Sequence, residues 1–202
     1  MSEIIVRAAK REEIAPLLLR DHYITQATKK FRAQVCVGVF IDGECHAACV
    51  FAQPSSPEAI MGAFGLPKGQ FFGIFELTRF CISDTFRARL DYAGSWFMSR
   101  AVKLLRVTEN PRALITYADA SLHDGGLYRA SNFTYCGLTD PKRDFWFLND
   151  DGTYVKHGRG RVSGQPGEWR PRTRKHRYVL VFDKELRLLW PSIVFKASNV
   201  NA

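Results

Sequence analysis

Two charged side chains interrupt an otherwise apolar stretch of the chain, residues 70–82 (QFFGIFELTRFCI). The guanidinium of Arg79 can hold an anion or a carbonyl group through its paired donors, and Glu76 can orient it. The other interpretation is a structural ion pair in the core, and the sequence leaves both open. Because a shift of one residue in strand register reverses the two faces, the sequence does not say which of these side chains faces a site.

A third charged residue, Asp119, follows a short apolar segment, residues 113–118 (ALITYA). Functional groups collect at the carboxyl ends of strands in α/β proteins, and a carboxylate there can take up a proton from an amino group. Asp119 can equally serve only as the N-cap of the segment after it. With His22 and His123 it also forms a set of imidazole and carboxylate groups that could bind a metal ion.

The pattern of apolar residues predicts the elements that position these side chains. We expect strands at residues 3–8, 34–40, 44–53, 70–82, 113–118, 134–138 and 177–182, and helices at 10–21, 91–107 and about 124–132. The pair Asp42-Gly43 predicts a hairpin, whereas residues 54–68 are expected to form a loop. This order of elements predicts an α+β fold, with a mixed sheet flanked by helices.

Size and composition narrow the class of protein further. The 202 residues, 46% of them hydrophobic, suit a single domain spanning residues 1–202. No apolar run of about 18 residues occurs, and the charged amino terminus does not resemble a signal peptide, so we expect a soluble, cytoplasmic protein with no membrane partner. The cysteines are odd in number and lack metal-binding spacing, which predicts buried free thiols at Cys36, Cys45, Cys49, Cys81 and Cys136.

The formal charge of +9 indicates an anionic partner, substrate or cofactor. Between Lys156 and Arg177 there are eight Lys or Arg residues and one acid, Glu168, and most of this stretch belongs to a basic insertion at about 140–176. Such residues neutralise phosphates, and an aromatic side chain can stack on an unpaired base; the alternative is a solvated basic loop. The nucleic-acid-binding candidates here are Lys156, His157, Arg159, Arg161, Trp169, Arg170, Arg172, Arg174 and Lys175.

Residues 113–137 combine a strand, a short helix with Leu127-Tyr128 before Ser131-Asn132-Phe133, and a strand with Gly137. This unit resembles the closing half of the GNAT acyltransferase fold, which implies a mostly antiparallel sheet and acetyl-CoA or a related CoA thioester as cofactor. The resemblance places Tyr128 near the cofactor sulfur, where a phenol can return a proton to a thiolate; otherwise Tyr128 is a core residue. It implies further cofactor contacts from Phe80, Cys81, Ile82, Arg87, Arg89, Ala93, Gly94, Ser95 and Asn132, although the glycine-spaced phosphate turn of the superfamily is absent.

A second set of residues is not required of an ordinary GNAT protein. It comprises His22-Tyr23, residues 76–80 (ELTRF), Ser95 and Ser99, residues 117–119 (YAD), His123 with Gly126, residues 128–133 (YRASNF), Tyr135, Gly137 and residues 157–159 (HGR). In this order and spacing they resemble the phage Mom family over roughly residues 20–180. The resemblance implies conversion of the N6 amino group of adenine in double-stranded phage DNA to a carbamoylmethyl (acetamido) derivative, which protects the DNA from restriction.

The Mom resemblance also assigns roles to individual residues. It implies catalytic roles for Arg79, Asp119, Tyr128, His22 and Glu76 and a DNA contact for Tyr23. Enzymes similar to these have been linked to iron, for which His22, Asp119 and His123 are the candidate ligands, and a phage-encoded protein of this kind would act in the host cytoplasm. We expect Arg79, Asp119 and Tyr128 to converge at a splayed edge of the sheet, beside the cationic insertion.

Two other functions remain open from the sequence. One is an ordinary GNAT N-acetyltransferase that uses acetyl-CoA to modify a small-molecule or protein amine. The other is a nucleic-acid-binding module without catalysis, which the missing phosphate-turn glycines favour.

Overall fold

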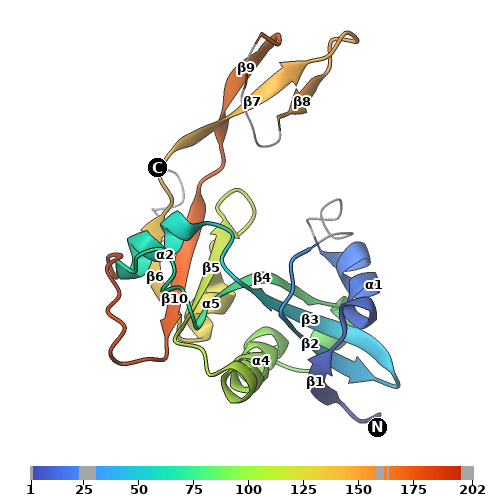
Figure 1. The fold of residues 1–202 in the computed structure, drawn as a ribbon. Coiled ribbons are helices and arrows are strands. Elements are labelled where there is room, and N and C mark those ends of the chain that lie inside the picture. The colour runs from blue at the N-terminus through green and yellow to red at the C-terminus, as the bar shows by residue number, and fades with distance from the viewer. Residues whose placement is uncertain (1, 23–30, 158–161, 163, 197–202) are drawn as a thin grey trace.

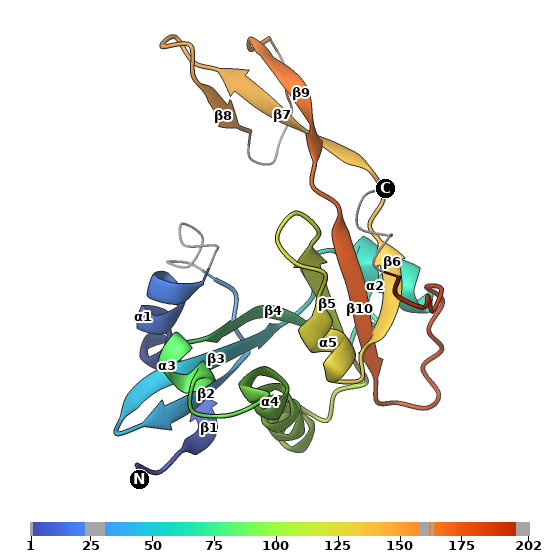
Figure 2. The ribbon, with the colours of Figure 1, turned by 180° about the vertical axis from the view of Figure 1, so that it is seen from behind.

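The computed structural model describes residues 2–22, 31–157, 162 and 164–196 of the 202-residue chain. A seven-stranded sheet with helices on both faces forms the body of the molecule, and a separate three-stranded sheet projects from it (Figures 1 and 2). Within the described residues, none of the helices combines the length and the hydrophobicity needed to span a bilayer.

The large sheet has the spatial strand order β1-β2-β3-β4-β5-β10-β6. All neighbouring strands are antiparallel except β4 and β5, which are parallel. The expected mixed and mostly antiparallel sheet is therefore confirmed. The strands are β1 (Ile5–Ala9), β2 (Val35–Ile41), β3 (Glu44–Ala52), β4 (Ile74–Ile82), β5 (Ala113–Asp119), β6 (Thr134–Leu138) and β10 (Lys175–Val181).

Helices cover the two faces of this sheet separately. Helices α4 (Ala93–Glu109) and α5 (Gly126–Ala130) contribute to the largest core cluster, on one face. Helix α1 (Arg11–Asp21) packs on the opposite face over β2 and β3, and α2 (Pro57–Phe64) packs on that face over β5 and β10. A four-residue helix, α3 (Asp84–Arg87), joins β4 to the segment before α4.

Helix α2 lies within residues 54–68, which the sequence analysis interpreted as a loop, and this interpretation is wrong. Pro57 occupies the start of the helix, and Gly65 ends it in the left-handed conformation at φ 68°. Between them, Ile60, Ala63 and Phe64 are buried against the sheet. The Pro and Gly residues that suggested a loop therefore mark the two ends of a short helix.

Strands β4 and β5 pair only along their first halves, from Ile74 opposite Ala113 to Leu77 opposite Thr116. Beyond Leu77, β4 stays paired with β3, while β5 continues beside β10, so the two parallel strands diverge (Figure 1). This divergence is called the splay below. It opens at the carboxyl ends of both strands, on the side from which the three-stranded sheet projects.

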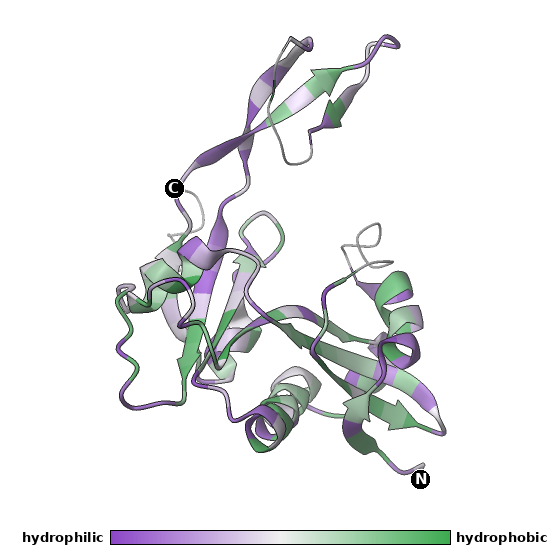
Figure 3. Ribbon diagram, viewed as in Figure 1, coloured by the Kyte–Doolittle hydropathy of each residue, from purple (hydrophilic) through white to green (hydrophobic). Residues whose placement is uncertain are grey.

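The three-stranded sheet, called the flap, consists of β7 (Lys142–Leu148), β8 (Tyr154–Lys156) and β9 (Gly167–Arg172) in the order β8-β7-β9. The sequence analysis placed an insertion here but expected no strands in it. Most side chains of β8 and β9 are exposed, so these strands lack the apolar alternation that indicates a strand on a core. The ends of β7 and β9 nearest the body are hydrophilic (Figure 3).

All five cysteines are buried and free, as expected. Burial raises the pKa of the Cys45 thiol to about 12 and that of Cys81 to about 11. Because the thiolate is the reactive form, these thiols are inert core residues at neutral pH.

Candidate functional site

The charged residues of β4 and β5 share one face of the large sheet. Arg79 pairs with Val50, which belongs to the core under α1, whereas its neighbour Phe80 pairs with Cys49 on the α4 face. Asp119 follows Ala118, which is also in the α4-side core, so its side chain lies on the opposite face, that of α1 and α2. Glu76 lies on that same face, since Leu77 is part of the α4-side core.

A β-bulge explains how Glu76 and Arg79 come to share this face. Residues three apart in a regular strand point to opposite faces. The pairing of β3 with β4 passes from Val50–Arg79 directly to Phe51–Leu77, which leaves Thr78 as an extra residue. The Thr78 hydroxyl donates to the Val50 carbonyl oxygen at 3.2 Å, and Arg79 Nη1 donates to the Thr78 carbonyl oxygen at 2.7 Å. The bulge therefore brings both charged groups to the edge of the splay on one face.

Tyr128 lies on the other face, with its ring in the α4-side core. Its ring centroid is 5.2 Å from that of Tyr178 and 5.6 Å from that of Phe133, and the residue is 7% exposed. We expected Tyr128 to converge with Arg79 and Asp119 at the splayed edge of the sheet, but its ring packs in the core on the opposite face, so this expectation is wrong. Strand alternation separates them, and Tyr128 flanks the sheet from the face opposite to that of the two charged residues.

Asp119 ends β5 and caps the turn that follows it. Its Oδ1 atom accepts hydrogen bonds from the backbone N–H of Ser121 at 3.0 Å and from the Ser121 hydroxyl at 2.7 Å. The Asp119 carbonyl oxygen accepts from the N–H groups of Leu122 and His123. Asp119 therefore caps the turn after β5, which is close to the N-cap role considered for it. These hydrogen bonds hold its carboxylate at the mouth of the splay.

A pocket of about 380 Å³, called the α2-side pocket, lies on the same face as Glu76. The Glu76 Oε2 atom accepts a hydrogen bond from the backbone N–H of Ser55 at 2.9 Å. Burial and the charge of Glu76 raise the pKa of the neighbouring Tyr117 phenol, while Arg177 opposes that rise. Its lining comes from the start of α2, from β4, β5 and β10, from the base of the flap, and from the C-terminal segment, and it includes Ser55, Glu58, Gly62, Glu76, Tyr117, Asp140, Lys142, Arg172, Lys175, Arg177 and Trp190.

In the described part of the chain, four cations and three carboxylates line this pocket, and the cations lie on β10 and at the base of the flap. The Arg177 guanidinium carbon lies 4.7 Å from the centroid of the Trp190 ring, and the buried Arg177 Nε atom has no hydrogen-bond partner among the described residues. Lys175 pairs in register with Asp119, and Lys142 and Arg172 bring the ends of β7 and β9 to the rim. An anionic or hydrogen-bond-accepting ligand is therefore favoured here.

The flap carries most of the predicted nucleic-acid contacts. Arg170 lies over the Tyr154 ring at 4.2 Å and pairs with Glu168 at 2.5 Å, and the Trp169 side chain is 50% exposed. Lys156 and Arg172 both lie near Asp144, at 2.5 and 3.8 Å. The His157 ring stacks edge-on against Phe147, and Arg174 Nε donates to the Thr139 carbonyl oxygen. Tyr23, Arg159 and Arg161 lie outside the described residues.

The residues expected to contact a cofactor divide between the two faces of the sheet. The Phe80 ring packs on Phe97 of α4 at 5.5 Å, whereas Cys81 is buried beneath α1. On the α4 face, a groove of about 950 Å³ runs between α4 and the end of α5, lined by Ser95, Ser99, Lys103, Arg106, Ser131 and Asn132 among others. The Ser131 hydroxyl oxygen is buried and lacks a hydrogen-bond partner among the described residues.

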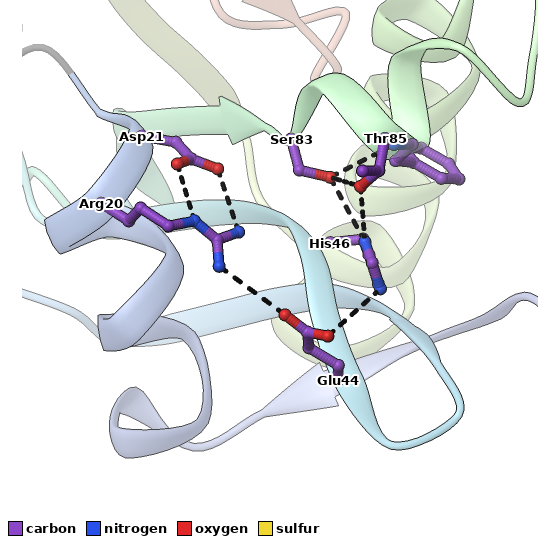
Figure 4. A network of polar contacts seen from close by, with 7 residues as sticks. Arg20, Asp21, Glu44, His46, Ser83 and Thr85 are labelled. Carbon is purple, nitrogen blue, oxygen red and sulfur yellow. Dashed lines mark hydrogen bonds and ion pairs between the residues drawn. The ribbon is translucent and has the colours of Figure 1, made fainter.

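A network of polar contacts occupies the turn after β4, near the residues for which the GNAT resemblance implied cofactor contacts (Figure 4). His46 Nδ1 lies 3.3 Å from the Ser83 hydroxyl and 3.1 Å from the Thr85 hydroxyl, and Glu44 lies between His46 and Arg20. The Ser83 hydroxyl accepts from the N–H of Phe86, the third residue of α3. Polar groups of this turn bond to one another, and Arg87 and Arg89 extend from it as exposed cations.

The start of α4 is closely packed as well. A Cβ atom added at Gly94 would lie 3.1 Å from Leu127 Cδ1, so Gly94 allows α4 to approach α5. The Ser95 hydroxyl donates to the carbonyl oxygen of Tyr92, and Ala93 is buried in the core. These contacts give Ala93, Gly94 and Ser95 a packing role whether or not a cofactor binds there.

The metal site considered for His22, Asp119 and His123 does not form. Within residues 2–22, 31–157, 162 and 164–196, no group of three His, Cys, Asp or Glu side chains could hold a metal ion. Burial and the charge of Arg79 lower the pKa of His22 to about 4. The same positive charge opposes a metal cation at His22, and the iron interpretation has no structural support.

Comparison with known families identifies the chain. The model of the Mom protein family matches residues 3–197. The chain belongs to this family. No curated protein matches this sequence.

Solved structures show that this Mom-family chain has the GNAT fold. It is similar to a GNAT-family acetyltransferase from Streptococcus pneumoniae (TM-score 0.52, 12% identity, covering 89% of this chain and 100% of that one). It is also similar to ribosomal-protein-alanine N-acetyltransferases from Brucella melitensis (0.51, 15%, 88% and 99%) and Escherichia coli (0.50, 9%, 90% and 95%). At these identities the likeness concerns the fold.

The sequence analysis of this Mom-family chain missed three residues that build the α2-side pocket. Tyr117 was noted only within a motif, although it stands two residues before Asp119 and so shares its face. Arg177 could have been found as a cation inside a strand that is otherwise apolar from Tyr178 to Val181. Trp190 follows the last strand, and no periodicity predicts that it returns to the pocket.

Proposed function

We propose that this protein transfers a carbamoylmethyl (acetamido) group to the N6 amino group of adenine in double-stranded DNA. Membership of the Mom family and the GNAT fold support a group-transfer enzyme. One observation carries the DNA substrate: the α2-side pocket adjoins the splay and shares Lys142 and Arg172 with the base of the cationic flap. Cations that could contact phosphates thus lie at the rim of a pocket beside the diverging strands.

The residues around the splay can supply the chemistry of such a transfer. Asp119 is a carboxylate at the mouth of the splay and can take up a proton from the attacking amino group. Arg79 provides a guanidinium on the same face, where its paired donors can hold the carbonyl oxygen of the carbamoylmethyl amide. Both roles require the substrate to approach from the face of α1 and α2.

A CoA thioester is the cofactor that the fold implies, and residues of the α4 face fit it in part. Ser95, Ser99 and the unpartnered Ser131 hydroxyl offer hydrogen-bonding groups, and Lys103 and Arg106 offer positive charge for phosphates, all within one groove. When bound, a thioester would supply an activated carbonyl carbon. Attack by an amine at that carbon breaks the C–S bond and gives an N-acyl product, whereas the N6–CH2 bond of a carbamoylmethyl group requires a donor that carries its leaving group on the methylene carbon. Tyr128 lies on this face, so its proposed role as a proton donor to the departing sulfur remains compatible with its position.

The target atom must leave the duplex to be reached. The adenine N6 group is hydrogen-bonded to thymine in double-stranded DNA, and extruding the base costs a few kcal/mol. Cations on the flap can hold the backbone of the flanking nucleotides while the base is extruded. The flap thus has a positioning role in this proposal, and the body provides the chemistry.

Mass spectrometry of nucleosides from DNA of cells that express the protein tests this function. We expect a deoxyadenosine derivative heavier by one carbamoylmethyl group, which disappears in Asp119→Asn. Glu109→Asn, an exposed change at the end of α4 far from the splay, should leave the product in place. Unmodified adenine in cells with abundant folded protein would contradict the proposal.

An ordinary N-acetyltransferase acting on a small-molecule or protein amine is the second candidate. It is favoured by the splay, Tyr128 and the α4-side groove, none of which depends on the flap. Acetylation of an amine by acetyl-CoA, without any change in DNA, would select this function.

A further inference from the structure

The α2-side pocket contains polar groups that the fold does not use. Arg177 Nε is buried without a hydrogen-bond partner among the described residues. Glu76 uses only one carboxylate oxygen, Oε2, in its bond to the Ser55 N–H. Unsatisfied groups that surround a pocket cost stability unless a ligand or water satisfies them.

The wall of this pocket is a flat, rigidly held surface. Trp190 is held by the C-terminal segment, in which the N–H of Leu189 donates to the Ala63 carbonyl oxygen of α2 at 2.7 Å. At Gly62 an added Cβ atom would lie 3.1 Å from Trp190 Nε1, so α2 and the indole ring are in close contact. The guanidinium of Arg177 lies over this ring. This contact holds the guanidinium in place, so that its N–H groups are available as donors at the pocket.

The hydrogen-bonding pattern of the pocket selects among bases. Glu76 offers an acceptor, whereas Tyr117 and Arg177 offer donors beside it. Adenine presents an amino donor next to ring-nitrogen acceptors, which complements this arrangement. In the orientation proposed for adenine, guanine and hypoxanthine would place a carbonyl oxygen against the Glu76 carboxylate and an N1–H group against the donors of Tyr117 and Arg177.

Volume and charge are also suited to a nucleotide. A pocket of about 380 Å³ falls in the range that holds small organic ligands. The cations at its rim, Lys142, Arg172 and Lys175, lie where the phosphates on either side of an inserted base would be neutralised.

We propose that the α2-side pocket receives an unstacked adenine, with Glu76 accepting from its amino group and Tyr117 and Arg177 donating to its ring nitrogens. The inference rests on the proposed action on DNA, and it assigns the base-recognition site of that reaction. Recognition of this kind precedes chemistry, so it can be measured without any group donor.

Binding of single-stranded oligonucleotides separates base recognition from the cost of extrusion. The probes are thymine oligonucleotides with one central adenine or one central hypoxanthine, and their dissociation constants are measured at one salt concentration. We expect wild-type protein to prefer adenine about tenfold. Glu76→Gln should lose or reverse this preference, because its amide can donate to the hypoxanthine carbonyl oxygen. Glu109→Gln, the same change on the opposite side of the sheet, should keep the preference.

A second variant keeps the test decisive if Glu76→Gln does not fold. Tyr117→Phe removes only the hydroxyl, and we expect it to weaken binding of the adenine probe several-fold with little change for an all-thymine strand. Equal binding of adenine and hypoxanthine by the wild type, or an unchanged preference in both pocket variants, would overturn the inference. If Glu76→Gln and Tyr117→Phe still modify DNA, the adenine binds at another site. If the wild-type protein prefers adenine but does not modify DNA, only the proposed function is contradicted.

Discussion

The two faces of the large sheet differ sharply on either side of the splay. The α4 face is apolar and aromatic, and at its centre Tyr178 is fully buried and contacts the rings of Tyr128 and Tyr135. The opposite face carries charges where the strands diverge, with Glu76, Arg79 and Asp119 on β4 and β5 and Arg177 on β10. The strands are shared, so alternation alone decides which role a residue has.

This difference indicates a division of roles among the residues next to the splay: the aromatic cluster around Tyr178 stabilises the fold, and the charged residues on the opposite face serve ligand binding and transfer. Removing a ring from the aromatic cluster should cost stability, and removing one of the charged groups should cost binding or transfer with little effect on unfolding. A residue whose replacement changed both stability and binding would show that the two faces are energetically coupled through the splay.

Deletion of Thr78 is expected to have the largest effect. Without the bulge, either Glu76 or Arg79 must turn into the apolar α4 face, and a buried unpaired charge costs several kcal/mol. We expect loss of DNA modification together with a large decrease in the free energy of unfolding, measured by denaturant titration. Thr78→Val is the matched control: it keeps the bulge, loses the bond to Val50, and should cost only about 1 kcal/mol.

The bulge also shows where prediction from the sequence ends. The positions of β2, β3, α4 and β5 follow from apolar periodicity and from the Asp42-Gly43 turn, and the structure confirms them. The bulge depends on how β3 pairs with β4, and the residue pattern of one strand alone does not predict this pairing. Helix α2 and the flap strands were missed because one is short and bounded by loop-forming residues and the others lack a buried face.

The candidate site was predictable in its residue types and not in its geometry. Glu76, Arg79 and Asp119 stand out as charges in apolar strands, and the structure places all three on one face. Tyr128 stands out as well, but only the three-dimensional fold shows that its ring is buried against Tyr178 on the other face. Trp190 reaches the pocket through a long C-terminal connection whose course depends on tertiary packing.

Tyr178→Ala should have the next largest effect and would test the stabilising role of the α4 face. The Tyr178 ring is fully buried, and its hydroxyl donates to the Asp124 carbonyl oxygen and accepts from Arg129 Nη1. Loss of a buried aromatic side chain costs about 3–5 kcal/mol. Arg177→Gln, one residue away on the other face, should change the free energy of unfolding by less than about 1 kcal/mol while it weakens adenine binding. Equal destabilisation by both changes would contradict the division between the faces.

The pH dependence of stability tests the positive charge of the splay face. Burial and Arg79 lower the folded-state pKa of His22 to about 4, whereas the unfolded chain binds this proton near pH 6.5. As pH falls from about 6.5 to 4, the unfolded state takes up the proton first, so stability decreases by up to about 3 kcal/mol. Denaturant titrations at several pH values should show this decrease in the wild type and a shallower one in His22→Gln. Parallel pH profiles would show that His22 titrates normally in the folded protein.

The salt dependence of DNA binding should show the smallest effect and concerns the flap. Each neutralised phosphate contributes a slope of about 0.9 to the fall of log affinity with log salt concentration. If Arg172 and Arg174 each contact one phosphate, replacing both by Glu should reduce the slope by about 1.8. Between 50 and 200 mM salt, this change in slope corresponds to roughly a tenfold difference in affinity. Lys184→Glu is the control, because this exposed cation follows the end of β10 that is farthest from the flap. A slope reduced equally by both changes would mean that the protein attracts DNA through its overall charge, and the flap would then lose its assigned role in holding the phosphates beside the α2-side pocket.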